Sequence, residues 1–268
     1  MSPARLRYYA SSIPTLLRGV ANWPATAAAL ARGPRRAPFV VELRDGGRFR
    51  IGSALDLWIL KEVCLDREYE RYGPAVRNGW TVVDVGAGVG EFCIQVARRH
   101  PDCRIYAFEP GAEAFALLRE NVDLNAVGNV RIFPRAVGAR AGESVLYRPA
   151  GARARASTAP AAGRAGEAGT RVPTTTLGEI FRDLDIPRCD FLKMDCEGAE
   201  YDILMDADAA TLDRIAHMSI EYHDGVTALS GADLAAWLES RGFRVRRIPN
   251  PARPRSLGWL SATNPRHL

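Results

Sequence analysis

The sequence predicts an α/β protein with a Rossmann-like sheet of seven strands, mostly parallel with one antiparallel strand. From residue 80 onward, short apolar runs alternate with segments of helical periodicity, which is typical of right-handed crossovers between parallel strands. A glycine-rich turn follows the first of these runs. The last two apolar runs are joined by about eight residues, too few for a helical crossover, so we expect them to be antiparallel.

The apolar runs and the periodic segments place each element of this sheet. Strands are expected at residues 81–85, 104–108, 130–136, 190–194, 218–222, 243–248 and 257–263. Helices are expected at residues 91–99, 112–124, 177–183, 199–205 and 232–241. Residues 144–147 and 172–175 are expected to pair as short strands around residues 148–171, an Ala/Gly/Arg-rich segment without periodicity. We interpret that segment as a solvent-exposed loop, with a lid over the substrate as the alternative.

The residues before the sheet form an N-terminal extension, residues 1–79, ahead of a main domain at residues 80–268. Its first part has interrupted helical character. Residues 39–51 are predicted to form a hairpin, because Asp45, Gly46 and Gly47 separate two alternating runs. A helix with an apolar face is expected at residues 55–66. A cap over the main domain and a homodimer contact are the two roles considered for this extension.

Composition excludes several classes of protein. With 268 residues, 47% of them hydrophobic and 25% charged, the chain suits one large domain with an appendage. No apolar run is long enough to cross a bilayer, and Pro14, Arg18 and Pro24 argue against a secretory signal. The five cysteines are scattered without a CxxC pair, which predicts reduced thiols in a cytoplasmic protein and no zinc site. The net charge of +5 comes almost wholly from arginine without interleaved aromatics, so no nucleic-acid surface is predicted.

The ends of the first two strands predict a nucleoside pocket. The first strand ends at Asp84 and continues into alternating glycines, unlike the G-x-G-x-x-G spacing of dinucleotide-binding turns. Glu109 ends the second strand, where a carboxylate can accept both ribose hydroxyls. The carboxylates of Asp84 and Glu91 would repel a diphosphate and attract a ligand that carries an ammonium and a sulfonium group, namely S-adenosyl-L-methionine. The expected contacts are Asp84, Gly86, Ala87, Gly88, Gly90, Glu91, Glu109, Pro110, Ala136 and Asp195.

Polar side chains also follow the fourth and fifth parallel strands. Asp195 follows one, and Glu221 and His223 follow the other. Each has a structural alternative, such as a helix cap or a surface histidine, but all three are expected to converge on one crevice. A hydroxyl acceptor must lose its proton on methylation, so we favour His223 or Asp195 as the base. A divalent cation held by the three residues is the second hypothesis, and no dedicated metal site is predicted. Cys196 is interpreted as a buried filler rather than a nucleophile.

These motifs resemble the FkbM-type S-adenosylmethionine-dependent methyltransferases. The resemblance runs from about residue 56 to residue 243 and is carried by residues 82–92, 107–110, 118–126, 135–138, 172–177 and 191–200. It implies a class I methyltransferase fold, Asp195 near the methyl donor, and O-methylation of a hydroxyl on a small molecule, sugar or secondary metabolite. Gly88 stands where the family commonly has Asn, and Cys196 where it usually has Val. A nicotinamide-dependent oxidoreductase and a non-catalytic nucleoside-binding protein are the alternatives.

Overall fold

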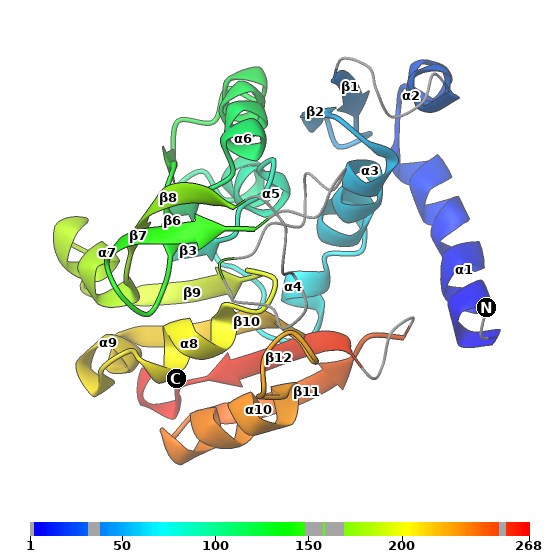
Figure 1. The fold of residues 1–268 in the computed structure, drawn as a ribbon. Coiled ribbons are helices and arrows are strands. Elements are labelled where there is room, and N and C mark those ends of the chain that lie inside the picture. The colour runs from blue at the N-terminus through cyan, green and yellow to red at the C-terminus, as the bar shows by residue number, and fades with distance from the viewer. Residues whose placement is uncertain (1–2, 32–37, 148–157, 159–168, 252–255) are drawn as a thin grey trace.

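The computed structural model describes residues 3–31, 38–147, 158, 169–251 and 256–268 (Figure 1). Within these residues, seven strands form the central sheet in the order β11-β12-β10-β9-β3-β4-β5. β12 runs antiparallel to both of its neighbours, and the other neighbouring pairs are parallel. This strand order with one reversed strand is the class I methyltransferase arrangement, which confirms the predicted fold. The strands are β3 (Thr81–Val85), β4 (Arg104–Phe108), β5 (Val130–Phe133), β9 (Cys189–Met194), β10 (Ile215–His223), β11 (Arg244–Pro249) and β12 (Leu257–Thr263).

Helices cover both faces of this sheet, and the sheet separates two hydrophobic cores. Side chains alternate along β3, so Val82 packs into one core and Val83 into the other. The first core holds α5 and the N-terminal region, and the second holds α7, α8 and α10. The helices of the main domain are α5 (Glu91–Arg99), α6 (Ala112–Leu124), α7 (Leu177–Asp183), α8 (Glu200–Met205), α9 (Ala209–Asp213) and α10 (Gly231–Ser240). The short α9 was not predicted.

A small second sheet lies beside the end of β5. The expected strand at residues 130–136 is wrong beyond Phe133, because Pro134 cannot donate to the ladder and the chain changes sheets. The chain continues as β6 (Ala136–Val137), which pairs with β8 (Thr170–Thr175), and β8 pairs antiparallel with β7 (Gly142–Leu146). The prediction that the segments around residues 144–147 and 172–175 pair is confirmed, but the register differs, because Val145 and Leu146 lie opposite Arg171 and Thr170 and only Ser144 lies opposite a residue of the predicted range, Val172. The loop expected at residues 148–171 falls mostly outside the described residues.

The N-terminal region packs onto the main domain. The predicted hairpin is confirmed, whereas the helix expected at residues 55–66 is divided between an α-helix and a π-helical segment. Asn121 of α6 joins the hairpin to the glycine turn, because its amide accepts from the Arg50 backbone N–H at 2.6 Å and donates to the Val89 carbonyl at 2.9 Å. The elements are α1 (Pro3–Gly19), α2 (Trp23–Ala31), β1 (Phe39–Glu42), β2 (Arg48–Ile51), α3 (Ala54–Leu60), η1 (Lys61–Leu65) and α4 (Glu68–Arg71).

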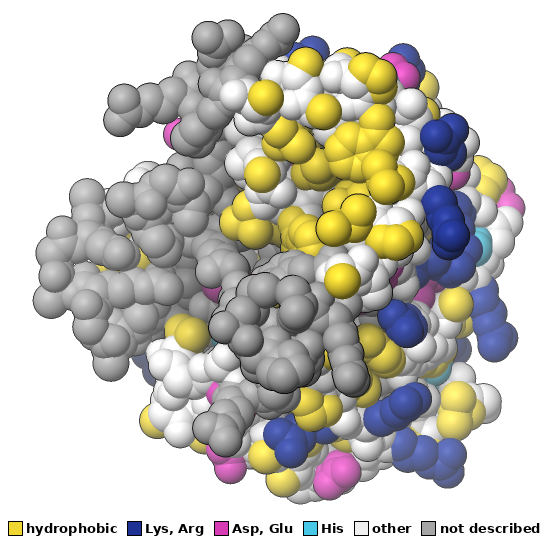
Figure 2. Space-filling model, turned by 90° about the vertical axis from the view of Figure 1, so that its right-hand side faces the viewer, with side chains coloured by type: hydrophobic (Ala, Val, Ile, Leu, Met, Phe, Trp, Pro, Cys, Tyr) yellow, Lys and Arg dark blue, Asp and Glu magenta, His cyan; other side chains and the backbone are white. Residues whose placement is uncertain are grey.

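Hydrophobic side chains gather on the side of the molecule that carries α1 and α2 (Figure 2). In α1, Ile13 and Leu17 are 56% and 53% exposed. Within the described part of the chain, no helix has both the length and the hydropathy to cross a bilayer. The homodimer and the division at residue 80 stay predictions.

Candidate active site

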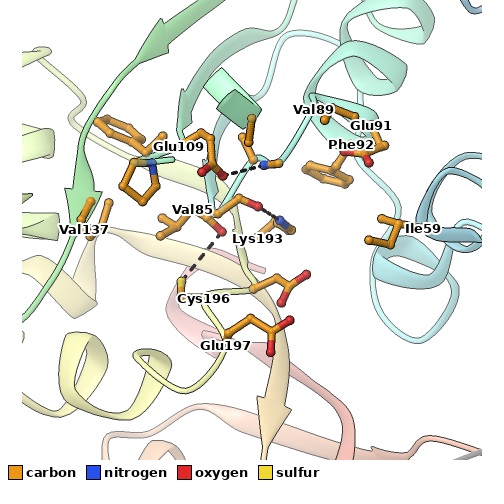
Figure 3. A pocket seen from close by; sticks show the side chains of 18 of the residues that line it. Ile59, Val85, Val89, Glu91, Phe92, Glu109, Val137, Lys193, Cys196 and Glu197 are labelled. Atoms are coloured by element: carbon orange, nitrogen blue, oxygen red, sulfur yellow. Dashed lines mark hydrogen bonds between the residues drawn. The ribbon is translucent and has the colours of Figure 1, made fainter. Parts of the chain in front are cut away.

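A cavity opens at the carboxyl ends of β3, β4 and β9, and its empty space, including the open mouth, is about 1000 Å³. The N-terminal region forms its opposite wall, where Ile59 lies across the cavity from Val137 (Figure 3). Among the expected donor contacts, Asp84 and Gly90 lie beneath the cavity surface. The others line it: Gly86, Ala87, Gly88, Glu91, Glu109, Pro110, Ala136 and Asp195.

The glycine turn brings the end of β3 against the chain that follows β9. Gly86 has a φ of +76°, in the left-handed region that favours glycine. The backbone N–H groups of Gly86 and Ala87 both donate to the Phe108 carbonyl at 3.0 Å, which binds the turn to β4. A Cβ atom on Gly86 would lie 1.9 Å from the Asp195 carbonyl oxygen. The close approach therefore requires glycine at this position.

Glu109 presents a carboxylate at the surface of the cavity. It is 7% exposed, and one of its oxygens accepts from the Gly88 N–H at 2.9 Å (Figure 3). The other oxygen accepts from the Gly111 N–H at 2.7 Å. Burial raises the pKa of Glu109 to about 7, against the lowering effect of these two hydrogen bonds. Each carboxylate oxygen can accept a further hydrogen bond. The residue therefore fits the ribose diol of an adenosyl ligand, and Pro110 supplies an apolar wall beside it.

Asp84 stabilises the glycine turn through Lys193. It is fully buried, and its Oδ1 lies 3.1 Å from the ammonium of Lys193, which also donates to the Gly86 carbonyl at 2.6 Å. Burial raises the pKa of Asp84, and the neighbouring Lys193 opposes that rise. Although burial alone would lower the pKa of Lys193, the charge of Asp84 outweighs it and raises the value. The sequence placed Asp84 among the ligand contacts, whereas the structure pairs it with Lys193.

Tyr69 of α4 connects two of the three predicted catalytic residues. Its hydroxyl lies 2.8 Å from Asp195 Oδ2 and 3.2 Å from Glu221 Oε2. The ring of Tyr69 is held edge-on against Phe92, with the Lys193 ammonium 5.1 Å from its centroid. Tyr69 and Asp195 line the cavity. Glu221 lies behind Tyr69 and is connected to the cavity by its contact with the Tyr69 hydroxyl.

His223 joins two further carboxylates beside this group. Its Nδ1 lies 3.2 Å from Glu200 Oε1 and its Nε2 lies 3.5 Å from Glu197 Oε2. Although burial alone would lower the pKa of His223, the hydrogen bond and the charge of Glu200 raise it to about 10. His223 is therefore an imidazolium at neutral pH.

Replacing His223 with Gln should remove a pH-dependent part of the stability. A histidine whose pKa is about 10 when folded and about 6.5 when unfolded stabilises the fold fully below pH 6.5. That stabilisation is lost as the pH rises through 10. Between pH 7 and pH 10, urea unfolding should show the wild type losing about 1.5–3 kcal/mol more than His223→Gln.

His217→Gln is the matched control for that experiment. His217 is also buried, but burial lowers its pKa, so this histidine is neutral throughout the same pH window. Its replacement should leave the pH slope of the wild type in place. An unchanged slope in His223→Gln would contradict the imidazolium assignment.

One group of side chains has the spacing of metal ligands. Single ligand atoms of Asp195, Glu200 and His223 lie within 4.8 Å of one another. The Glu200 carboxylate already accepts the backbone N–H groups of Cys196 and Gly198, both at 2.8 Å. Together with the positive charge of His223, these bonds favour a hydrogen-bonded cluster over a metal centre. The metal ligands considered from the sequence were Asp195, Glu221 and His223, so this group has Glu200 in place of Glu221.

The thiol of Cys196 lies 3.9 Å from the Val85 carbonyl (Figure 3). Burial, followed by the charge of Glu200, raises its pKa well above the ordinary value. The sulfur is therefore a neutral thiol, which argues against a nucleophilic role, but Cys196 is half-buried at the cavity surface rather than the buried filler expected from the sequence. The five cysteines all lie in the described part of the chain, and each is a free thiol.

The strand order, the glycine turn and the carboxylate of Glu109 together define a class I S-adenosylmethionine-dependent methyltransferase. Comparison with known proteins agrees, because the model of the methyltransferase FkbM domain matches residues 84–245. The chain belongs to the FkbM methyltransferase family. Membership of this family argues against the nicotinamide-dependent oxidoreductase that was considered as an alternative from the sequence.

Three curated relatives have similar sequences. The 31-O-demethyl-FK506 methyltransferase FkbM of Streptomyces tacrolimicus is 29% identical over 221 residues, covering 72% of this chain and 84% of that protein. The hexuronic acid methyltransferase AglP of Haloferax volcanii is 24% identical over 201 residues, and the match covers 74% of this chain and 80% of AglP. The AMB antimetabolite synthetase AmbE of Pseudomonas aeruginosa is 28% identical over 226 residues, and the match spans 70% of this chain but 10% of AmbE.

Among solved structures, methyltransferase FkbM from Methylobacillus flagellatus is 16% identical, with a TM-score of 0.47. The match covers 76% of this chain and 53% of that chain.

Proposed function

We propose that this enzyme methylates a hydroxyl group of an uncharged small molecule or sugar. The observation that carries the proposal is the position of Asp195, whose carboxylate lines the donor cavity and is held by Tyr69 at 2.8 Å. A carboxylate so placed can accept the proton that a hydroxyl loses on methylation.

The residues that would hold the donor lie on one side of this cavity. We propose that Glu109 accepts both ribose hydroxyls, while Pro110 and Ala136 contact the adenine. Glu91, whose pKa burial raises to about 8, stands beside the glycine turn near the amino-acid end of the donor. When bound, S-adenosylmethionine supplies an activated methyl group, so orientation of the acceptor provides much of the catalysis.

We assign the role of base to Asp195 rather than to His223. Both ring nitrogens of His223 face carboxylates, and a pKa of about 10 leaves it without a free lone pair at neutral pH. The histidine instead fixes Glu197 and Glu200 beside the chain segment that carries Asp195. Replacement of a positioned base costs about 10²- to 10⁴-fold in rate.

The wall beyond Asp195 supports an acceptor without negative charge. Ile59, Val63 and Tyr69 form its apolar part, and Asp195 and Glu197 add two carboxyl groups. Among the described lining residues, Lys193 is the cation, and it is already paired with Asp84. An anionic acceptor would therefore meet like charges. The name of the Streptomyces relative specifies O-methylation, whereas AglP is named for hexuronic acids.

Matched pairs of acceptors test this proposal. Transfer of a labelled methyl group from S-adenosylmethionine should be measured with methyl glycosides and with the corresponding methyl glycosiduronates, which differ only in the carboxylate. We expect the neutral member of each pair to accept label at least about tenfold faster, which is about 1.4 kcal/mol of discrimination. Asp195→Asn should lower that rate about 10²-fold or more. Faster labelling of the uronates would contradict the proposal.

A further inference from the structure

We infer that Asp195 and Glu221 share one proton through the Tyr69 hydroxyl, and that this carboxyl pair gives the proton up when the positively charged methyl donor binds. The inference rests on the proposed function, since Asp195 is the proposed base. It adds a reason for the carboxyl pair to carry its second negative charge only in the presence of the donor.

The geometry of the Tyr69 hydroxyl limits how many protons the pair holds. The hydroxyl has a single proton and lies 2.8 Å from Asp195 Oδ2, so we assign that proton to the shorter contact. The contact with Glu221 Oε2 at 3.2 Å then needs a proton from the glutamate. Two ionised carboxylates facing one hydroxyl oxygen would repel each other. The consistent arrangement is Glu221 O–H donating to Tyr69, and Tyr69 donating to the Asp195 carboxylate.

The charges around the pair favour retention of that proton. Burial, followed by the charge of Asp195, raises the pKa of Glu221 well above its ordinary value, while His223 lowers it. Burial, with Asp195 and Glu221, also raises the pKa of Tyr69, so its hydroxyl stays protonated. The ionisable groups that act on the three residues from the surrounding elements include Glu62 of η1, Glu68 of α4, Asp84 of β3, Lys193 of β9 and His223 of β10.

Most of these neighbouring groups are acidic or are already paired with an opposite charge. The Lys193 ammonium is paired with Asp84 at 3.1 Å, and His223 faces Glu197 and Glu200. Glu62 and Glu68 both raise the pKa of Glu221 further. The pair therefore keeps one proton in the free enzyme, and an added positive charge beside Asp195 is what would favour its release.

The methyl donor brings that positive charge on its sulfur, and its demethylated product does not. Binding of S-adenosylmethionine should thus release a proton that binding of S-adenosylhomocysteine leaves in place. During transfer, the acceptor oxygen forms the new C–O bond and the C–S bonding electrons stay on sulfur. The O–H bonding electrons return to the acceptor oxygen, and its proton passes to Asp195. Tyr69 is a positioning residue here, because it acts through Asp195.

Calorimetric titration measures the released proton without any acceptor. Both ligands are titrated into the enzyme at pH 7.5 in phosphate and in Tris, whose ionisation enthalpies differ, and the slope of the observed enthalpy gives the protons exchanged. We expect S-adenosylmethionine to release about 0.5–1 proton more than S-adenosylhomocysteine. Any proton that Glu109 exchanges on binding contributes equally for both ligands, because they carry the same ribose, and it therefore cancels in the difference between the two proton counts.

Variants assign the proton to the carboxyl pair. Glu221→Gln should abolish the difference between the ligands, and Tyr69→Phe should reduce it. Glu68→Gln is the matched control, because burial raises the pKa of Glu68 to about 9 but its carboxyl does not contact the Tyr69 hydroxyl. In this variant the difference in released protons between the two ligands should persist. Equal proton counts for the two ligands in the wild type would overturn the inference and leave the proposed function standing. A full difference in either Glu221→Gln or Tyr69→Phe would overturn the assignment to this pair. If the wild type bound neither ligand, the proposed function would fail as well.

Discussion

Replacing Gly86 with alanine should lower the free energy of unfolding by roughly 3–5 kcal/mol. The added Cβ would lie 1.9 Å from the Asp195 carbonyl oxygen and 2.9 Å from its carbon, both in the backbone, so no side chain can move aside. The φ of +76° adds the strain of an L-residue in the left-handed region. Urea unfolding followed by circular dichroism measures the loss.

Gly79→Ala separates backbone strain from steric overlap. Gly79 has a φ of +80°, close to that of Gly86, but among the described residues, apart from Gly79 itself and its two chain neighbours, no heavy atom lies within 4 Å of the position that its Cβ would take. Alanine there should cost about 1–2 kcal/mol, from the left-handed conformation alone. Equal losses at the two glycines would contradict the close contact between the turn and Asp195.

Replacing Glu109 with alanine should weaken the binding of S-adenosylhomocysteine by at least about 100-fold. Two hydrogen bonds to a charged acceptor contribute about 1.5–3 kcal/mol each, and 1.4 kcal/mol corresponds to a tenfold change in affinity. Glu109→Gln keeps one acceptor oxygen and should lie between alanine and the wild type. Titration calorimetry at pH 8 measures all three, with Glu239→Gln, an exposed carboxyl of α10, as control.

The pH dependence provides a further check on the same residue. Burial raises the pKa of Glu109 to about 7, and the proposed contact with both ribose hydroxyls needs the ionised form as acceptor. Affinity for S-adenosylhomocysteine should therefore decrease as the pH falls through 7 in the wild type and change less in Glu109→Gln. A wild-type affinity that rises as the pH falls would contradict the ionised-carboxylate contact.

The sheet could be predicted from the sequence because parallel strands buried on both faces appear as continuous apolar runs. β3 and β4 match their expected bounds, since a glycine turn follows one and Glu109 and Pro110 follow the other. The strand expected at residues 130–136 overran because Ala136 and Val137 are also β-structure, but in another sheet. Apolar pattern alone does not show which sheet a strand joins.

The polar half of the site was less predictable, because its contacts depend on the folded chain. Tyr69 lies 126 residues before Asp195 and 152 before Glu221, and no motif marks it. Its position two residues after Arg67, which has a φ of +55°, reflects a local bend that composition does not reveal. The two carboxylate partners of His223 likewise follow from the turn around Gly198, which has a φ of +107°.

A crystal structure of the complex with S-adenosylhomocysteine tests the central claim most directly. We predict that the two oxygens of Glu109 lie about 2.5–3.0 Å from the 2′- and 3′-hydroxyls of the ribose. The thioether sulfur should face Asp195, with Tyr69 still bound to that carboxylate. A ligand whose ribose lies away from Glu109, or whose sulfur faces away from Asp195, would contradict the account.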